Sequence, residues 1–135
     1  EPTPVLDVDM LLAAWRQAKA TAEQARADIT LTLEEYGKAY VDKDVDVIQE
    51  VYPEAPIDAI SEHFGETTYE LYAFAPPEFT MLDIRAGTAT VESTLERKFE
   101  ARVGGEREGK DDREITFVRQ ENGGRWLISG WRILK

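Results

Sequence analysis

The chain has 135 residues, the length of one domain, and its formal net charge at pH 7 is −11. This acidity argues against nucleic acid and anionic membrane surfaces as partners, because both bind clustered cations. The absence of cysteine excludes disulfides, thiolate catalysis and cysteine-based metal sites. A hydrophobic share of 42% is enough for a packed core.

The negative charge lies in residues 1–87, whereas residues 88–135 are close to neutral. No run of about eighteen apolar residues occurs, so we expect no membrane insertion by this segment. The sequence begins Glu1-Pro2-Thr3-Pro4 without a methionine, so we expect it to be a trimmed, mature or excised piece. We expect an extracytoplasmic location, periplasmic or at the cell surface, and a cytoplasmic location is the alternative.

Apolar and small residues recur at intervals of four and three in the first third of the chain. They are Leu11, Trp15, Ala18, Ala22, Ala25 and Ile29, continued by Leu33, Tyr36 and Tyr40. The spacing predicts either one helix from about Asp7 to Val41 or two helices broken near residues 29–32, where β-branched residues weaken helix propensity. We divide the chain into an N-terminal helical extension (1–28) and a main domain (29–135). The small residues predict a close neighbour: the domain itself, a second copy or a missing part of the parent protein.

Two short helices follow, at residues 45–52 and 56–64, and then the period of the apolar pattern changes to two. Strands are predicted at residues 67–74, 78–84, 88–103, 113–120 and 125–134, with a charged hairpin loop at 104–112 and a turn at 121–124. On the third strand the face with Ala89, Val91 and Leu95 is expected to point inward. This order predicts an α+β fold with helices on one face of a strongly curved antiparallel sheet.

Three segments together resemble the NTF2-like superfamily, also called the SnoaL-like or cystatin-like α+β cone. They are Leu33-Glu34-Glu35-Tyr36 through Val51-Tyr52-Pro53, then Ile84-Arg85-Ala86-Gly87-Thr88-Ala89-Thr90-Val91, and the ending Gly124-Arg125-Trp126-Leu127-Ile128-Ser129-Gly130-Trp131. The resemblance covers about residues 29–135 and is closest to bacterial members that serve as accessory domains. It implies a bent sheet wrapped around the long helix, with a pocket at the open end.

Family members use that pocket for isomerase, dehydratase, cyclase or epoxide-hydrolase chemistry, and many others only bind or assemble. Dehydratase-type members pair two histidines, but this chain has one, His63. Epoxide-hydrolase-like members need an asparagine beside their acids, and the one here, Asn122, lies in a glycine-rich turn. We therefore assign no catalytic residues, and whether the chain is an enzyme stays undecided, with the balance against it.

The candidate ligand-binding residues are Tyr36, Tyr40, Ser93, Arg97 and Arg119. The two arginines each interrupt an apolar alternation, and if both side chains point inward they line the pocket and favour an anionic ligand. The alternative is that they lie at the rim or pair with Glu34, Glu35 or Asp83. The tyrosines are expected to fill the cone or to surround a hydrophobic ligand.

No metal site and no cofactor are predicted. Asp42, Asp44 and Asp46 have the start of a calcium-loop spacing, but Val47 and Pro53 stand where that loop needs glycine and glutamate. We interpret these acids as a helix start with capping carboxylates, and His63 as a packing or capping residue.

The sequence thus predicts a non-catalytic binding or assembly module. Its partner is expected to be another protein or a second copy, bound through the sheet or the N-terminal helix, with a small hydrophobic or anionic ligand in the cone. One alternative is a small isomerase or lyase that acts on a hydrophobic substrate through Tyr36, Tyr40, Asp83 and Arg97. Another is a sensor domain that binds a small anion through Arg97 and Arg119.

Overall fold

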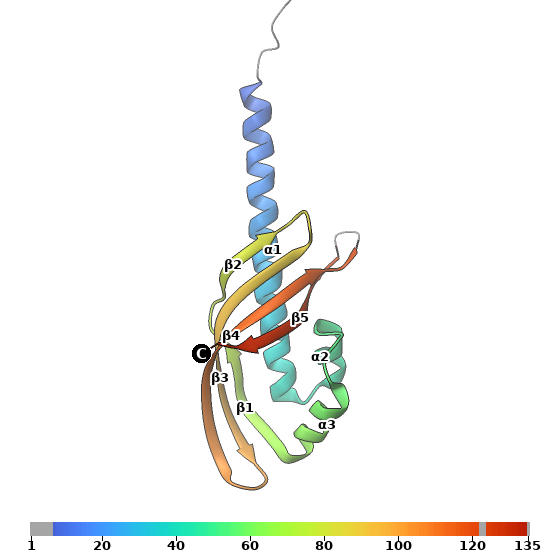
Figure 1. The fold of residues 1–135 in the computed structure, drawn as a ribbon, viewed down its shortest axis with the longest axis vertical. Helices are drawn as coiled ribbons and strands as arrows, with labels where there is room; N and C mark the ends of the chain where they lie inside the picture. Colours follow the sequence, from blue (N-terminus) through green and yellow to red (C-terminus); the bar gives the residue numbers. More distant parts are fainter. Residues whose placement is uncertain (1–6, 122–123, 135) are drawn as a thin grey trace, which may run out of the picture.

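The computed structural model describes residues 7–121 and 124–134, which form three helices and five strands (Figure 1). These are α1 (Val8–Asp42), α2 (Val45–Val51), α3 (Ile57–Glu66), β1 (Thr67–Phe74), β2 (Glu78–Asp83), β3 (Thr88–Ala101), β4 (Gly105–Arg119) and β5 (Trp126–Ile133). The predicted proline-rich entry at residues 1–4 and the centre of the predicted turn, Asn122 and Gly123, lie outside the described residues. The α+β class with helices before a curved antiparallel sheet is confirmed.

Helix α1 is continuous, so the first of the two predicted alternatives is correct. Asp7 caps it by accepting a hydrogen bond from the backbone N–H of Met10 at 3.1 Å. The β-branched segment at 29–32 stays helical because it packs: Ile29 is fully buried, and Thr32 donates its hydroxyl to the Trp126 carbonyl at 2.9 Å. The helix therefore passes through the boundary that we drew between residues 28 and 29.

The sheet has the order β1-β3-β4-β5, with every pair antiparallel, and β2 pairs with the first half of β3. The predicted hairpin loop at residues 104–112 is wrong. Strand β4 begins at Gly105, and β3 and β4 pair without interruption from Thr88 opposite Val118 to Ala101 opposite Gly105.

The error has a physical reason. The first half of β4 contains only charged residues and glycine, which weakens the strand pattern, yet its partner β3 holds it in register. Thr94 donates a hydrogen bond to Asp112 at 2.6 Å, and Lys98 lies 3.8 Å from Glu108. Cross-strand pairing with β3, together with these polar contacts, maintains this part of the ribbon.

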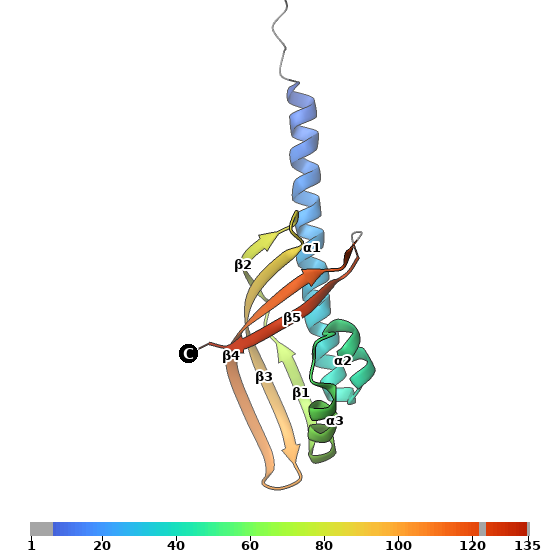
Figure 2. The ribbon, with the colours of Figure 1, turned by 45° about the vertical axis from the view of Figure 1, so that its right-hand side comes forward.

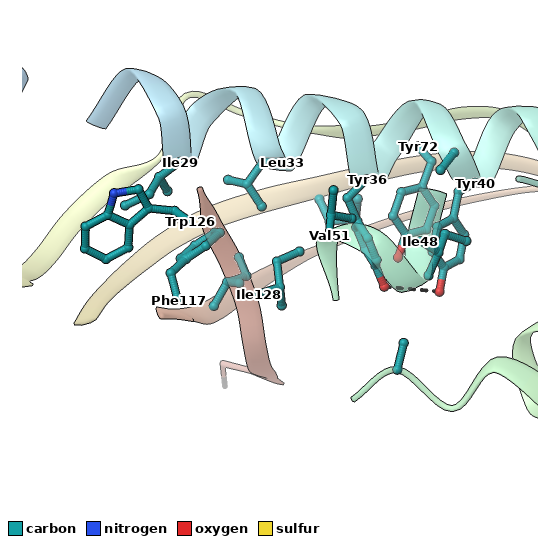
Figure 3. Close-up of a cluster of buried hydrophobic side chains, with 14 of the residues drawn as sticks. Ile29, Leu33, Tyr36, Tyr40, Ile48, Val51, Tyr72, Phe117, Trp126 and Ile128 are labelled. Carbon is teal, nitrogen blue, oxygen red and sulfur yellow. Dashed lines mark hydrogen bonds between the residues drawn. The ribbon is translucent and has the colours of Figure 1, made fainter. Parts of the chain in front are cut away.

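The core lies between the C-terminal half of α1, the short helix α2 and the inner face of the sheet (Figures 2 and 3). Ala89, Val91 and Leu95 of β3 are at most 1% exposed, which confirms the predicted inward face. They meet Phe117 of β4 and Trp126 of β5 in one apolar cluster. The sheet curves around α1 and covers it from one side (Figure 2).

The N-terminal half of α1 extends away from this body as a bare helix (Figures 1 and 2). Residues 7–20 are all exposed, Thr21 is the first partly buried residue of the helix, and Ala25 is the first buried one. No described helix is both long enough and apolar enough to cross a membrane.

Gly37 marks the closest approach of α1 to the sheet. A Cβ atom at this position would overlap the carbonyl oxygen of Tyr72 on β1, which is backbone and has no freedom to rotate away. The crossing of α1 over β1 therefore depends on the absence of a side chain.

We expect Gly37→Ala to lower the free energy of unfolding by about 1–3 kcal/mol, because the methyl group must push α1 away from β1. The matched control is Gly65→Ala in α3, where a Cβ would meet nothing within 4 Å. Its expected effect is neutral to stabilising by up to about 1 kcal/mol, from better helix propensity. Chemical denaturation measures both, and equal effects of the two substitutions would contradict the close crossing.

Tyrosines fill the part of the core where α1 meets β1. The rings of Tyr40 and Tyr72 stack with centroids 4.0 Å apart, and the Tyr36 hydroxyl donates to the Tyr40 hydroxyl at 3.2 Å (Figure 3). Burial is the largest cause that raises the pKa of Tyr36 and of Tyr72 far above the ordinary value, and neighbouring tyrosines add to it. Both phenols therefore stay protonated wherever the protein is folded.

This burial makes stability depend on pH. Unfolding releases Tyr36 and Tyr72 to their ordinary pKa near 10, so their contribution to stability is complete below pH 10 and is lost as the pH rises above it. Each buried phenol is expected to add about 1.4 kcal/mol per pH unit to this loss. Tyr36→Phe should flatten the slope of unfolding free energy against pH, and Tyr52→Phe, a more exposed site, should flatten it less. Identical slopes for wild type and Tyr36→Phe would disprove the assignment.

Candidate functional site

The five predicted ligand-binding residues lie in different parts of the fold. Tyr36 and Tyr40 are buried neighbours on α1, and Ser93 on β3 donates its hydroxyl to the Ala75 carbonyl at 2.7 Å. Arg97 lies in the ribbon formed by β3 and β4, opposite Gly109. Arg119 lies at the other end of β4, where it donates to the Ile84 carbonyl at 3.2 Å and faces the Trp126 ring.

Arg97 and Arg119 therefore do not meet in one pocket. The salt-bridge partners that we considered for them also lie elsewhere: Glu35 pairs with Arg125 at 2.7 Å, and Asp83 accepts a hydrogen bond from the Ala86 backbone in the turn after β2. Nothing in the structure tests whether these arginines bind a ligand, so that role stays a prediction.

The partner of Arg97 is Asp111, which also binds a second arginine. Asp111 accepts one hydrogen bond from Arg97 Nη2 at 2.9 Å and one from Arg113 Nε at 2.7 Å. Arg113 is only 6% exposed. We call these three residues the Arg97–Asp111–Arg113 cluster.

Sequence reasoning missed Asp111 and Arg113. The predicted loop at residues 104–112 contains Asp111, and the predicted strand at residues 113–120 begins at Arg113. A signal was present, because Arg113 precedes Ile115 and Phe117 at intervals of two and so shares their inward face. Arg113 therefore lies on the inward face even of the predicted strand at residues 113–120, whereas Asp111 joins that face only because β4 begins at Gly105.

The strand register places the cluster beside the tyrosines. Arg97 pairs with Tyr72 of β1 on one side and with Gly109 of β4 on the other. The guanidinium carbon of Arg113 lies 4.2 Å from the centre of the Trp131 ring, a cation–π contact. Charged and aromatic side chains therefore share the inner face of the sheet.

Arg113 keeps its charge in this buried place. Burial alone lowers its pKa, but the hydrogen bond with Asp111 and the negative charge of that carboxylate raise it, and the net pKa is above the ordinary arginine value. The cluster therefore carries a permanent positive charge. The Tyr36 and Tyr72 phenols next to it are protonated, so they are hydrogen-bond donors rather than bases.

The remaining polar candidates have structural roles. The Nε2 atom of His63 lies 2.8 Å from the Tyr69 hydroxyl, in line with its interpretation as a packing residue. Asp44 caps α2 by accepting from the Val47 backbone N–H at 3.2 Å, and Asp46 lies in the first turn, which confirms the helix-start interpretation for these two acids. Asp42 is instead the last residue of α1. Within residues 7–121 and 124–134, no group of three or more histidine or acidic side chains is arranged to hold a metal ion.

An apolar groove of about 300 Å³ lies where α1 passes the end of β1. Thr30, Leu33, Glu34 and Gly37 form its helical wall, and residues 72–77 form the other wall. Tyr72 is the member of the tyrosine cluster that reaches it, whereas the Arg97–Asp111–Arg113 cluster does not line it.

No protein-family model and no curated protein matches the sequence. Solved structures match the fold. An NTF2-like superfamily protein from Salmonella enterica serovar Typhimurium superimposes with a TM-score of 0.63 at 16% identity, covering 83% of this chain and 91% of that one. A protein with a cystatin-like fold from Caulobacter vibrioides gives 0.60 at 14% identity, with the same coverage of 83% and 91%.

A third similar structure comes from Exiguobacterium sibiricum and is provisionally described as a Ca/calmodulin-dependent kinase II association domain. Its TM-score is 0.62 at 10% identity, over 79% of this chain and 89% of that one. At these identities the comparisons establish architecture alone. The chain has the NTF2-like, or cystatin-like, α+β cone fold.

Proposed function

We propose that this chain is a non-catalytic assembly module, and that the N-terminal half of α1 pairs with the same segment of a second copy. The observation that carries the proposal is the exposed apolar face of that segment. Trp15 is 61% and Leu11 49% exposed, and Val8, Met10 and Leu12 are exposed beside them. Large apolar side chains gathered on a bare helix mark an interaction surface.

The spacing of apolar and small residues along α1 indicates which face of the helix pairs. The four-and-three spacing that packs Ile29, Leu33 and Tyr36 on the sheet continues outward as Leu11, Trp15, Ala18 and Ala22. In the inner half this face is covered by the domain, and in the outer half it is bare. A helix face with this spacing is suited to packing against another helix.

The alternation of large and small residues favours a second copy in antiparallel orientation. In that arrangement Leu11 of one copy lies beside Ala18 of the other, and two-fold symmetry repeats the contact. Trp15 lies near the two-fold axis in this arrangement, beside Trp15 of the other copy, as it would in a parallel pair. A parallel pair would in addition place Leu11 against Leu11 and Ala18 against Ala18, with poorer filling of space. Antiparallel pairing also puts the two bodies at opposite ends of the helix pair.

Assembly is favoured over catalysis by the arrangement of the polar groups. An enzyme of the isomerase or lyase type needs a carboxylate near a tyrosine hydroxyl, and Asp83 is instead engaged in the turn after β2. In the described part of the chain, Tyr36 bonds to Tyr40 rather than to an acid. The similarity to a provisionally described association domain is consistent with assembly. The extracytoplasmic location stays a prediction, and the proposal does not depend on it.

The oligomeric state tests the proposal. We expect the chain to sediment as a dimer, and the variant Leu11→Glu with Trp15→Glu to be a monomer, because two carboxylates would be buried at the seam. The matched control, Ala13→Glu with Ala20→Glu, adds the same charge on the opposite face of the same helix and should remain dimeric. A monomeric wild type would overturn the proposal, and a dimer that survives in both variants would assign the interface to another surface.

A truncation separates assembly from folding. Because residues 7–20 are all exposed and the first buried residue of α1 is Ala25, a chain that begins at residue 21 should be monomeric yet nearly keep its denaturation midpoint. The comparison must be made at a concentration where wild type is already dissociated, since dimerisation itself adds stability. A large loss of stability in the truncated monomer would show that the outer half of α1 supports the fold.

A further inference from the structure

The Arg97–Asp111–Arg113 cluster has more positive than negative charge. Two guanidinium groups share one carboxylate, and among the described residues no other carboxylate lies within 4.0 Å of either arginine. The cluster therefore keeps one unneutralised positive charge on the inner face of an otherwise strongly acidic protein. A charge kept away from water normally has a counter-charge.

The hydrogen bonding of the cluster is also incomplete. A guanidinium has donors on three nitrogens, and in the described chain each arginine makes its one side-chain hydrogen bond to Asp111. The Nε atom of Arg97 is buried without an acceptor. The geometry leaves donors of two neighbouring guanidiniums for a further acceptor.

The side chains around the Arg97–Asp111–Arg113 cluster indicate which kind of ligand could accept these hydrogen bonds. Trp131 and Ile133 of β5 stand opposite Ile115 and Arg113 in the register, so they share the inner face. They are 43% and 54% exposed, although they face the same side as the core. Arg97 is 26% exposed through its side chain, so the cluster can be reached from solvent.

We propose that this face binds a small organic carboxylate, whose oxygens bind the guanidiniums of Arg97 and Arg113 and whose apolar part lies against Trp131 and Ile133. A planar carboxylate matches the donor geometry of arginine, and the exposed ring supplies the apolar surface. The site differs from the pair predicted from sequence, because Arg113 takes the place of Arg119. It is independent of the α1 seam.

A substitution at Gly109 tests the site without changing the net charge of the protein. It lies opposite Arg97, and a Cβ there would come within 2.7 Å of Arg97 Nη2. Gly109→Ala must therefore displace the guanidinium of Arg97 while both arginines and Asp111 remain. Arg97→Gln removes the charge, and Arg85→Gln, in the exposed turn after β2, is the control with the same change of net charge.

The experiment is a titration of the full chain with benzoate, followed by NMR of the three tryptophan indole N–H signals. We expect a saturable shift at Trp131, no comparable shift at Trp15, and no saturation with benzamide, which has the ring without the charge. Arg97→Gln and Gly109→Ala should each weaken benzoate binding by about tenfold or more, and Arg85→Gln should not. Circular dichroism confirms that each variant is folded.

Three outcomes would overturn the proposal. One is the absence of a saturable shift at Trp131 in the wild type. Another is equal binding of benzamide, which would reduce the site to an apolar patch. The third is equal weakening by Arg85→Gln, which would indicate attraction by overall charge. The titration follows the Trp131 signal, so a negative result would not affect the assembly proposal. A monomeric wild type would likewise not affect the carboxylate-binding proposal.

Discussion

The packing of the C-terminal half of α1 into the curve of the sheet is the contact on which the other features depend. Ile29 and Leu33 meet Trp126 and Phe117 there, and the missing side chain of Gly37 lets the helix cross β1 in contact with its backbone. Burial of these apolar surfaces supplies the main stabilisation of the domain. The contact also fixes the direction of α1 relative to the body.

Once that direction is fixed, the length of α1 determines the rest. A helix of 35 residues is about 50 Å long, and only the part from Thr21 onward packs on the body. The surplus extends into solvent and continues the pattern of large and small residues used inside the domain. The same periodicity therefore serves two interfaces, one within the chain and one that we assign to a second copy.

The sequence was informative where apolar periodicity was strong. The helix face from Ala25 to Tyr40 and the inward face of β3 were predictable because burial imposes a period on both. The first half of β4 was not, because it projects beyond the helical layer, and its residues are selected by pairing with β3 rather than by a core. The candidate site residues show the same difference. The spacing along the helix predicted Tyr36 and Tyr40. Asp111 and Arg113, in contrast, become neighbours of Arg97 only through the register of β3 and β4.

The central claim, that the outer half of α1 pairs antiparallel with itself, can be tested most directly by cross-linking, because the chain contains no cysteine of its own. A mixture of Leu11→Cys and Ala18→Cys chains is oxidised and compared with a mixture of Ala13→Cys and Ala20→Cys chains. The antiparallel seam predicts a covalent heterodimer in the first mixture and little in the second. Equal cross-linking in the two mixtures, or preferential cross-linking of Leu11→Cys chains with one another, would contradict it.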